Sequence, residues 1–223
     1  MANLENKDQQ YAREFTYFLQ HTNQKYTLAS YLKELVCDDL KTQFVDVGAG
    51  DGSITNIICS CFDRTLAIEP NSCLSSKLSE KVSIVASKIE DVQRLPKSDF
   101  ILFSHVSYYF QNASIPTIVN LVCRSLMASG LLCVVVQDES SNFTFDKAQD
   151  DSFVSFLLNT PIFYLDSNRV IKSSVTCDSV GMERISLFFR EALNFEIKVL
   201  KNRMDCSQRV FIFKKSGLTN TAI

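Results

Sequence analysis

The sequence predicts an α/β protein with a doubly wound, mostly parallel sheet of seven strands, one antiparallel strand near the C-terminus and helices on both faces. Three observations support this class. Short apolar runs alternate with helical segments up to residue 138, as they do in βαβ units. The run SDFILFSHV (98–106) is apolar on both faces, which is typical of a central parallel strand. The last two apolar runs are separated by too few residues for a crossover helix, so the strands that they form should be antiparallel.

Two amphipathic helices are expected before the first strand. Apolar residues recur at helical spacing from Tyr11 to Leu19 and again from Leu28 to Val36. The polar stretch QHTNQK (20–25) separates the two helices. The buried strand QFVDV (43–47) follows and ends at a glycine-rich turn, after which SITNIICSCF (53–62) is expected to form a helix.

The middle of the chain continues the alternation. RTLAIEP is the second predicted strand and closes at Pro70. A short helix is expected over 72–78, and KVSIVAS is the third strand. The fourth strand, SDFILFSHV, leads to an amphipathic helix over 113–128 that should end at Gly130, and LLCVVVQD is the fifth strand.

The C-terminal third has a different pattern. TCDSVGMERISLFFREAL (176–193) predicts a helix that begins at an N-cap, Asp178 or Ser179. FEIKVL and RVFIFKK are the last two predicted strands, and we expect them to pair with each other. Residues 138–175 carry the weakest pattern and are a possible lid insertion. The expected whole is a Rossmann-like single domain over 1–223, in which residues 1–40 form a helical cap over the site.

Composition narrows the classes of partner. The 223 residues are 46% hydrophobic and 22% charged, with a net charge of −2, which gives no basic footprint for nucleic acid. The apolar runs are far shorter than a membrane span. Eight cysteines without a C-x-x-C pair, and only two histidines, do not indicate a metal site. Scattered cysteines in a sequence without a signal peptide favour a reducing, cytoplasmic location. We expect a monomer or a homodimer with no nucleic acid or membrane partner.

The stretch FVDVGAGDGSI (44–54) carries the main functional signal. Glycines alternate in a turn between a strand and a helix. Glycine permits positive φ and lets a ligand approach the backbone closely. The N-terminus of the following helix favours a negatively charged or polar ligand. A nucleotide or nucleoside site is therefore expected, and the alternative is a tight turn that binds nothing.

The spacing of the glycines and acids narrows the ligand. The turn reads G-x-G-x-G, unlike the G-x-G-x-x-G of dinucleotide sites, and the chain has no P-loop motif. Asp46 precedes the first glycine, and Glu69 ends the second strand, where a carboxylate can accept hydrogen bonds from two ribose hydroxyls. DVGAGDG together with AIEP resembles the class I S-adenosylmethionine (SAM)-dependent methyltransferases.

That resemblance implies a SAM site and S-adenosylhomocysteine (SAH) as the product. The implied cofactor-binding residues lie in the glycine turn, after the second and third strands and at the end of the fourth. They are Asp46, Gly48, Ala49, Gly50, Asp51, Gly52, Glu69, Pro70, Lys88, Ile89, Glu90, Ser104 and His105.

A narrower resemblance concerns two other segments. YAREFTYFLQHTNQK and HVSYYFQNASIPTIVNLVCRSLMASGLLCVVV are similar to histamine N-methyltransferase and its relatives. This likeness implies substrate contacts from Tyr11, Phe15, Tyr108 and Tyr109. It also places Gln24, an amide, near the position of the amine-binding carboxylate of that family.

The expected function is methyl transfer from SAM to a small-molecule acceptor, at an amine nitrogen. The alternatives are methylation of a protein or of an oxygen atom, and a SAM-binding protein without catalytic activity. A nicotinamide-dependent oxidoreductase is disfavoured by the glycine spacing. His105 and Tyr109 are the catalytic candidates, although packing alone could explain His105, Tyr11 and Phe15. Methyl transfer from a sulfonium mainly requires positioning and exclusion of water, so no catalytic triad is expected.

Overall fold

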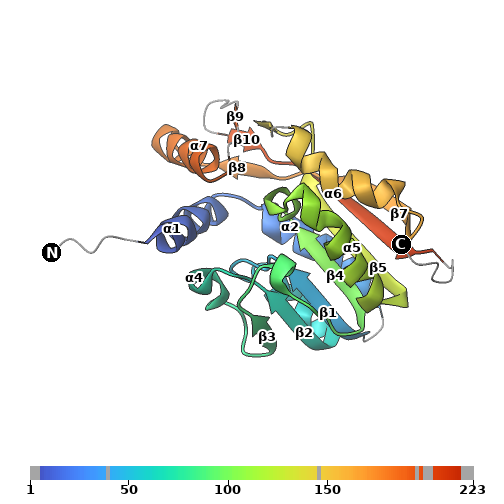
Figure 1. The fold of residues 1–223 in the computed structure, drawn as a ribbon. Helices are drawn as coiled ribbons and strands as arrows, with labels where there is room; N and C mark the ends of the chain where they lie inside the picture. Colours follow the sequence, from blue (N-terminus) through green and yellow to red (C-terminus); the bar gives the residue numbers. More distant parts are fainter. Residues whose placement is uncertain (1–5, 39–40, 145–146, 194–195, 198–202, 217–223) are drawn as a thin grey trace.

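A seven-stranded sheet forms the centre of the computed structural model, which describes residues 6–38, 41–144, 147–193, 196–197 and 203–216 (Figure 1). The strand order is β3-β2-β1-β4-β5-β11-β7. The strands are β1 (Lys41–Val47), β2 (Phe62–Ile68), β3 (Val82–Val85), β4 (Ser98–Ser104), β5 (Leu126–Gln137), β7 (Phe163–Ile171) and β11 (Gln208–Lys215). Strands β1 to β5 pair in parallel, and β11 runs antiparallel to both β5 and β7. The predicted class and its antiparallel strand near the C-terminus are confirmed.

Helices and two small sheets surround this sheet. The α-helices are α1 (Lys7–Gln20), α2 (Gln24–Val36), α3 (Thr55–Ile58), α4 (Ser72–Ser75), α5 (Ile115–Ser125), α6 (Lys147–Asn159) and α7 (Ser179–Leu193). Short 3₁₀ turns are η1 (Cys59–Cys61), η2 (Ile89–Asp91), η3 (Ser107–Tyr109) and η4 (Asn112–Ser114). The small sheets pair β8 (Ser174–Thr176) with β10 (Arg203–Asp205), and β6 (Phe143–Thr144) with β9 (Glu196–Ile197).

Both faces of the central strands are buried, as their apolar sequence predicts. Helices α5 and α6 cover one face, where Val122 and Phe153 pack against Phe103. Helices α2 and α3 cover the other face, where Leu32 and Ile58 belong to a second cluster. The central parallel strands are therefore packed between two apolar layers, as is typical of parallel sheets.

The last strand of the sheet corrects the sequence interpretation. Strand β7 comes from residues 138–175, which had the weakest pattern and were interpreted as a possible lid insertion. RVFIFKK pairs with β5 and β7, and the expected pairing with FEIKVL is wrong. Of FEIKVL, 196–197 pair with β6, and the other residues lie outside the described ranges. An edge strand needs little apolar sequence, and 164–170 are exposed.

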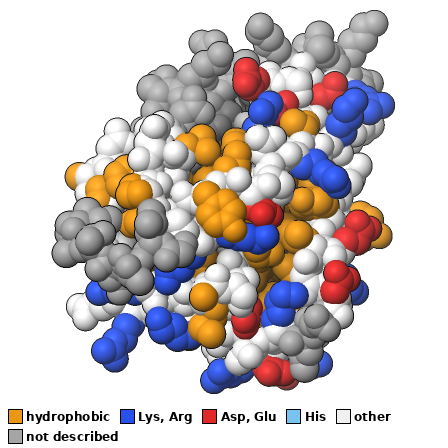
Figure 2. All heavy atoms as spheres, turned by 90° about the vertical axis from the view of Figure 1, so that its right-hand side faces the viewer, with side chains coloured by type: hydrophobic (Ala, Val, Ile, Leu, Met, Phe, Trp, Pro, Cys, Tyr) orange, Lys and Arg blue, Asp and Glu red, His pale blue; other side chains and the backbone are white. Residues whose placement is uncertain are grey.

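The face of the molecule on the side of β7 is mixed in chemistry. Hydrophobic side chains there alternate with acidic and basic ones (Figure 2). Asp166 lies at an irregularity in the pairing of β7 with β11 and forms an ion pair with Lys214, at 2.8 Å. A charged residue and an irregular register both oppose pairing with a further strand. This edge of the sheet is therefore protected from pairing with a strand of another molecule.

Two boundaries also differ from expectation. The helix after the fourth strand ends at Ser125, and Gly130 lies inside β5. A Cβ atom on Gly130 would lie 3.0 Å from the carbonyl oxygen of Ser98. The glycine thus permits close approach of two strands and does not end a helix. At the other predicted cap, Asp178 precedes α7 and accepts the N–H of Gly181, at 2.7 Å.

The cysteines include one pair that the sequence did not indicate. Cys37, after α2, is paired with Cys61 across a Cα–Cα distance of 5.1 Å, within the range that a disulfide spans. The other six cysteines are free. Among the described residues, no cluster of histidine, cysteine and acidic side chains is arranged to hold a metal ion. No helix within the described ranges is both long and apolar enough to cross a membrane.

Candidate functional site

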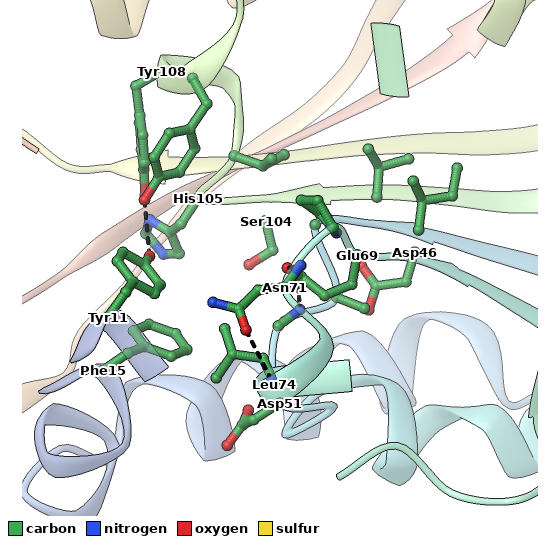
Figure 3. Close-up of a pocket in the computed structure, with 18 of the residues that line it drawn as sticks. Tyr11, Phe15, Asp46, Asp51, Glu69, Asn71, Leu74, Ser104, His105 and Tyr108 are labelled. Atoms are coloured by element: carbon green, nitrogen blue, oxygen red, sulfur yellow. Dashed lines mark hydrogen bonds between the residues drawn. The ribbon is translucent and has the colours of Figure 1, made fainter. Parts of the chain in front are cut away.

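A cavity of about 400 Å³ opens at the carboxyl ends of β1, β2 and β4. The chain order changes direction at β1, which has β2 on one side and β4 on the other. In open α/β sheets, ligands bind at such a switch point. Helix α1 contributes Tyr11 and Phe15 to the cavity (Figure 3), and α7 contributes Phe188 and Phe189.

The glycine turn after β1 has two structural roles. Gly48, Gly50 and Gly52 all have positive φ, at 73°, 58° and 77°. A Cβ atom on Gly48 or Gly52 would collide with Val106 or Leu78, at 2.6 and 2.7 Å. A Cβ atom on Gly50 would meet only a ring atom of Phe15, at 3.5 Å, and Gly50 is part of the cavity wall. Gly50 is therefore the position where the turn leaves room for a ligand, whereas the other two glycines allow tight internal packing.

Glu69 directly follows β2 and is fixed beside Gly50. Its Oε2 accepts the N–H of Gly50 at 2.9 Å, and its Oε1 accepts the N–H of Asn71 at 2.8 Å. The side chain is buried, and this burial raises the pKa of Glu69 above its usual value. Each carboxylate oxygen keeps a second lone pair. The carboxylate can thus accept two hydrogen bonds from a ligand that lies on the open side of Gly50.

Asp46 lies in β1 at the base of the cavity. Its Oδ2 accepts the hydroxyl of Thr55 at 2.5 Å, whereas its Oδ1 is buried and has no partner among the described residues. Burial raises the pKa of Asp46 to about 6. A buried acceptor without a partner is costly in a native structure and indicates a site for a ligand or an ordered water.

Lys25 supplies a positive charge to the same cavity. It follows the first residue of α2 and lines the wall. Its charge interacts with Asp46, Asp51 and Glu69, while burial lowers the pKa of Lys25. None of the ion pairs within the described part of the chain involves Lys25. Its ammonium group is therefore free to bind an anionic part of a ligand.

The end of β4 brings polar side chains to the centre of the cavity. The hydroxyl of Ser104 is buried and has no partner among the described residues. His105 has a φ of +56°, which is unusual for a residue with a side chain, and its N–H donates to the carbonyl of Val135 at 2.9 Å. Strained backbone of this kind is concentrated at functional sites. Ser104 and His105 both face the same space as Glu69 and Asp46 (Figure 3).

Aromatic side chains form the end of the cavity away from the glycine turn. We call this part the aromatic end, and it consists of Tyr11, Tyr108, Tyr109, Phe188 and Phe189. The hydroxyls of Tyr11 and Tyr109 are 2.9 Å apart and join α1 to η3. The ring of Phe188 lies 5.4 Å from that of Tyr11. None of these five side chains carries a charge near neutral pH, so this end suits an uncharged, flat molecule.

Comparison with known proteins identifies the architecture. No protein-family model matches the sequence, and no curated protein matches it. A SAM-dependent methyltransferase from Leishmania major superposes with a TM-score of 0.58 at 12% identity, over 96% of this chain and 87% of that chain. The N-methyltransferase NodS from Bradyrhizobium japonicum WM9, in complex with SAH, has a TM-score of 0.54 at 11% identity, over 96% and 93% of the chains. This chain has the class I SAM-dependent methyltransferase fold.

A further neighbour shows that this methyltransferase fold does not determine the acceptor atom. The mitomycin 7-O-methyltransferase MmcR superposes with a TM-score of 0.51 at 12% identity, over 86% of this chain and 53% of that chain. Its name specifies oxygen, whereas that of NodS specifies nitrogen. Neither these two nor the Leishmania structure is a histamine N-methyltransferase, so the narrower resemblance depends on the sequence alone.

Within this methyltransferase fold, nearly all sequence-predicted site residues lie around one cavity. The residues in its wall are Tyr11, Phe15, Gln24, Asp46, Gly48, Ala49, Gly50, Asp51, Glu69, Pro70, Lys88, Ile89, Glu90, Ser104, His105, Tyr108 and Tyr109. Gly52 is not in the wall and packs against Leu78 and Asn56 instead. The roles of these residues as ligand contacts stay predictions.

Gln24, which the narrower resemblance places near the substrate, also has a structural role. Its side chain is buried, and its Nε2 donates to the carbonyl of Cys206 at 3.1 Å and to Oε1 of Gln137 at 3.4 Å. The amide N–H groups are therefore committed to protein acceptors and fix α2 to the C-terminal strands. The sequence resemblance did not indicate this contact because it joins residues 182 positions apart.

Several wall residues of this methyltransferase fold were missed by the sequence analysis. The six most informative are Lys25, Asn71, Leu74, Gln137, Phe188 and Phe189. A lysine at the start of a helix after a polar break is a detectable signal for Lys25. The phenylalanines of α7 fall on an ordinary apolar helical face, and no local pattern shows that this face meets α1. The cover over the site therefore comes from α1 and α7, whereas α2 and 138–175 contribute largely to the core and the sheet.

Proposed function

We propose that the chain is a SAM-dependent methyltransferase that transfers a methyl group to a small-molecule acceptor at an amine nitrogen. The carrying observation is the carboxylate of Glu69, held by two backbone N–H groups beside Gly50, the glycine that leaves the turn open. This pair of features at the switch point fits a ribose with two hydroxyls. The structural neighbours that are named SAM-dependent methyltransferases, or hold SAH, support the same ligand.

The residues of the cavity fit the other parts of this cofactor. When bound, SAM supplies a methyl group on a cationic sulfonium. Glu69 would hold the ribose, and Lys88, Ile89 and Glu90 after β3 would lie beside the base. Lys25 would pair with the methionine carboxylate. Asp46, whose Oδ1 has no partner among the described residues, would accept a hydrogen bond from the methionine amino group of SAM or stabilise the positive charge of its sulfonium.

The acceptor would bind at the aromatic end. Tyrosine and phenylalanine faces bind a flat molecule, and the hydroxyls of Tyr11 and Tyr109 orient it. An alcohol or phenol must lose its proton during transfer and needs a general base, whereas a neutral amine does not. Burial lowers the pKa of His105 to about 3, which makes it a weak base. This weak basicity favours nitrogen over oxygen as the methylated atom.

Calorimetric titration with SAM and with SAH is the test of this proposal. We expect either compound to bind with micromolar affinity, and amines to accept a methyl group in an assay that measures released SAH. Binding without turnover across amines, phenols and peptides would support a cofactor-binding protein without catalysis. Failure of both compounds to bind would contradict the proposal.

Replacing Lys25 with methionine should weaken binding of SAH by about tenfold, because one charge-assisted hydrogen bond is worth about 1.5 kcal/mol or more. The control ligand is 5′-methylthioadenosine, which lacks the amino acid part. Its affinity should be the same for the variant and the wild type when both are measured by calorimetry. An equal loss of affinity for both ligands would mean that Lys25 maintains the structure of the site and does not bind the carboxylate of the cofactor.

A further inference from the structure

A buried glutamine side chain contacts the ring of His105. Gln208, at the start of β11, is fully buried. Its Nε2 donates to the main-chain carbonyl of Gln24 at 3.0 Å, and its Oε1 lies 2.9 Å from Nε2 of His105. Because the amide nitrogen already faces a carbonyl, the oxygen must be the atom that faces His105. An amide oxygen can only accept a hydrogen bond.

This contact determines which ring nitrogen of His105 carries the proton. An acceptor at 2.9 Å requires a hydrogen on Nε2, so the neutral ring has its lone pair on Nδ1. Burial and the charge of Lys25 lower the pKa of His105 to about 3, so the ring stays neutral at physiological pH. Nδ1 has no hydrogen-bond partner among the described residues, and His105 is part of the cavity wall.

We propose that Gln208 is a positioning residue that holds His105 in the Nε2–H tautomer, so that Nδ1 accepts a hydrogen bond from an N–H of the methyl acceptor. This inference rests on the proposed function. This hydrogen bond orients the acceptor nitrogen so that its lone pair points at the methyl group of SAM. His105 does not remove the proton of that N–H. As the new N–C bond forms and the C–S bond breaks, the electron pair of the broken bond stays on sulfur. The methylated nitrogen is then cationic and releases its proton to water.

The inference also defines the class of acceptor. The acceptor must carry an N–H for Nδ1 and must be uncharged before transfer, as in a primary or secondary amine of low basicity. An ammonium ion has no lone pair to attack the methyl group. A tertiary amine, or a pyridine-type nitrogen, has no N–H to donate. We therefore expect primary and secondary aromatic amines to be methylated and their fully substituted analogues to be inert.

Nitrogen-15 NMR of the histidine rings tests the tautomer without knowledge of the acceptor. The chain has only two histidines, so His21→Gln leaves His105 as the single reporter. With SAH present, we expect a protonated Nε2 and an unprotonated Nδ1 that do not change from about pH 5 to about pH 8. In Gln208→Leu, which lacks the acceptor, a population with the proton on Nδ1 should appear. A wild-type ring that is protonated on Nδ1, or an unchanged spectrum in Gln208→Leu, would overturn the proposal.

Two further variants separate positioning from general damage. Gln137→Leu removes an amide that accepts a hydrogen bond from Gln24 but has none with His105, and it should leave the His105 signals unchanged. Gln208→Glu keeps an acceptor, now charged, so it should retain the Nε2–H tautomer and raise the pKa of His105 into the measurable range. If Gln208→Leu does not fold, an unshifted titration in Gln208→Glu overturns the proposal. Calorimetry with SAH on the same samples reports separately on the proposed function.

Discussion

Replacing Glu69 with alanine should weaken the binding of SAH by at least about tenfold, and by about a hundredfold or more if both ribose hydrogen bonds are lost. A hydrogen bond to a charged group contributes about 1.5 to 3 kcal/mol, and the variant removes the carboxylate that would accept two of them. The variant also leaves the N–H groups of Gly50 and Asn71 without their present acceptor. Calorimetric titration with SAH measures the loss.

Two controls make this result specific to the ribose. Glu69→Gln keeps one amide oxygen for the backbone N–H groups and should therefore lose less affinity than the alanine variant. Asp63→Ala removes an exposed carboxylate at the other end of β2 and should bind SAH like the wild type. Unchanged affinity in Glu69→Ala, with the same unfolding temperature as the wild type, would remove Glu69 from the cofactor site.

Replacing Asp46 with asparagine should stabilise the protein near pH 8 while it weakens the binding of SAM. The pKa of Asp46 is raised from 3.8 to about 6 by burial. Between these values the folded state keeps a proton that the unfolded state has lost, so stability falls as pH rises through this window. Above about pH 6 the buried, charged Asp46 lowers the free energy of unfolding by its full amount, on the order of 2 to 3 kcal/mol. Asparagine carries no charge and keeps an oxygen for the hydroxyl of Thr55.

Denaturant unfolding at two pH values measures this effect. We expect Asp46→Asn to be more stable than the wild type near pH 8, and the difference to disappear near pH 4, where both side chains are neutral. Asp63→Asn, which changes an exposed carboxylate, is the matched control and should show little difference at either pH. A variant that is less stable than the wild type near pH 8 would contradict the assigned direction of the pKa shift.

The parts of the fold that could be predicted from the sequence are those with local signals. Strands β1 and β4 are continuous buried runs, and the glycine turn with Asp46 and Glu69 combines residues whose chemistry requires that spacing. Strand β7 was missed because an edge strand exposed over 164–170 has no apolar period. The boundary at Gly130 was misplaced because the glycine serves a close approach between strands, which only the tertiary structure shows.

The candidate site also has one part that the sequence predicts and one part that it does not. Its glycine end follows from the order of residues along β1 and β2, so sequence patterns reveal it. Its aromatic end is assembled from α1, η3 and α7, and the contact between Tyr11 and Phe188 has no local signal. The hydrogen bond from His105 to Gln208 joins residues 103 positions apart. Such a contact depends on the order of strands in the sheet, which the sequence does not specify residue by residue.

The way in which α1 is attached suggests how the cavity is entered. Phe18 of α1 packs with α7, β8 and β10 in an apolar cluster of its own, separate from the clusters of the sheet. Towards the glycine end, α1 is held by polar contacts, from Asn71 to the carbonyl of Asp8 at 3.1 Å and from Lys77 to Thr16 at 2.7 Å. Separating α1 from the glycine end would exchange only a few hydrogen bonds with water, whereas separating α1 from α7 would expose an apolar cluster. Entry to the cavity would therefore cost least on the side of the glycine turn.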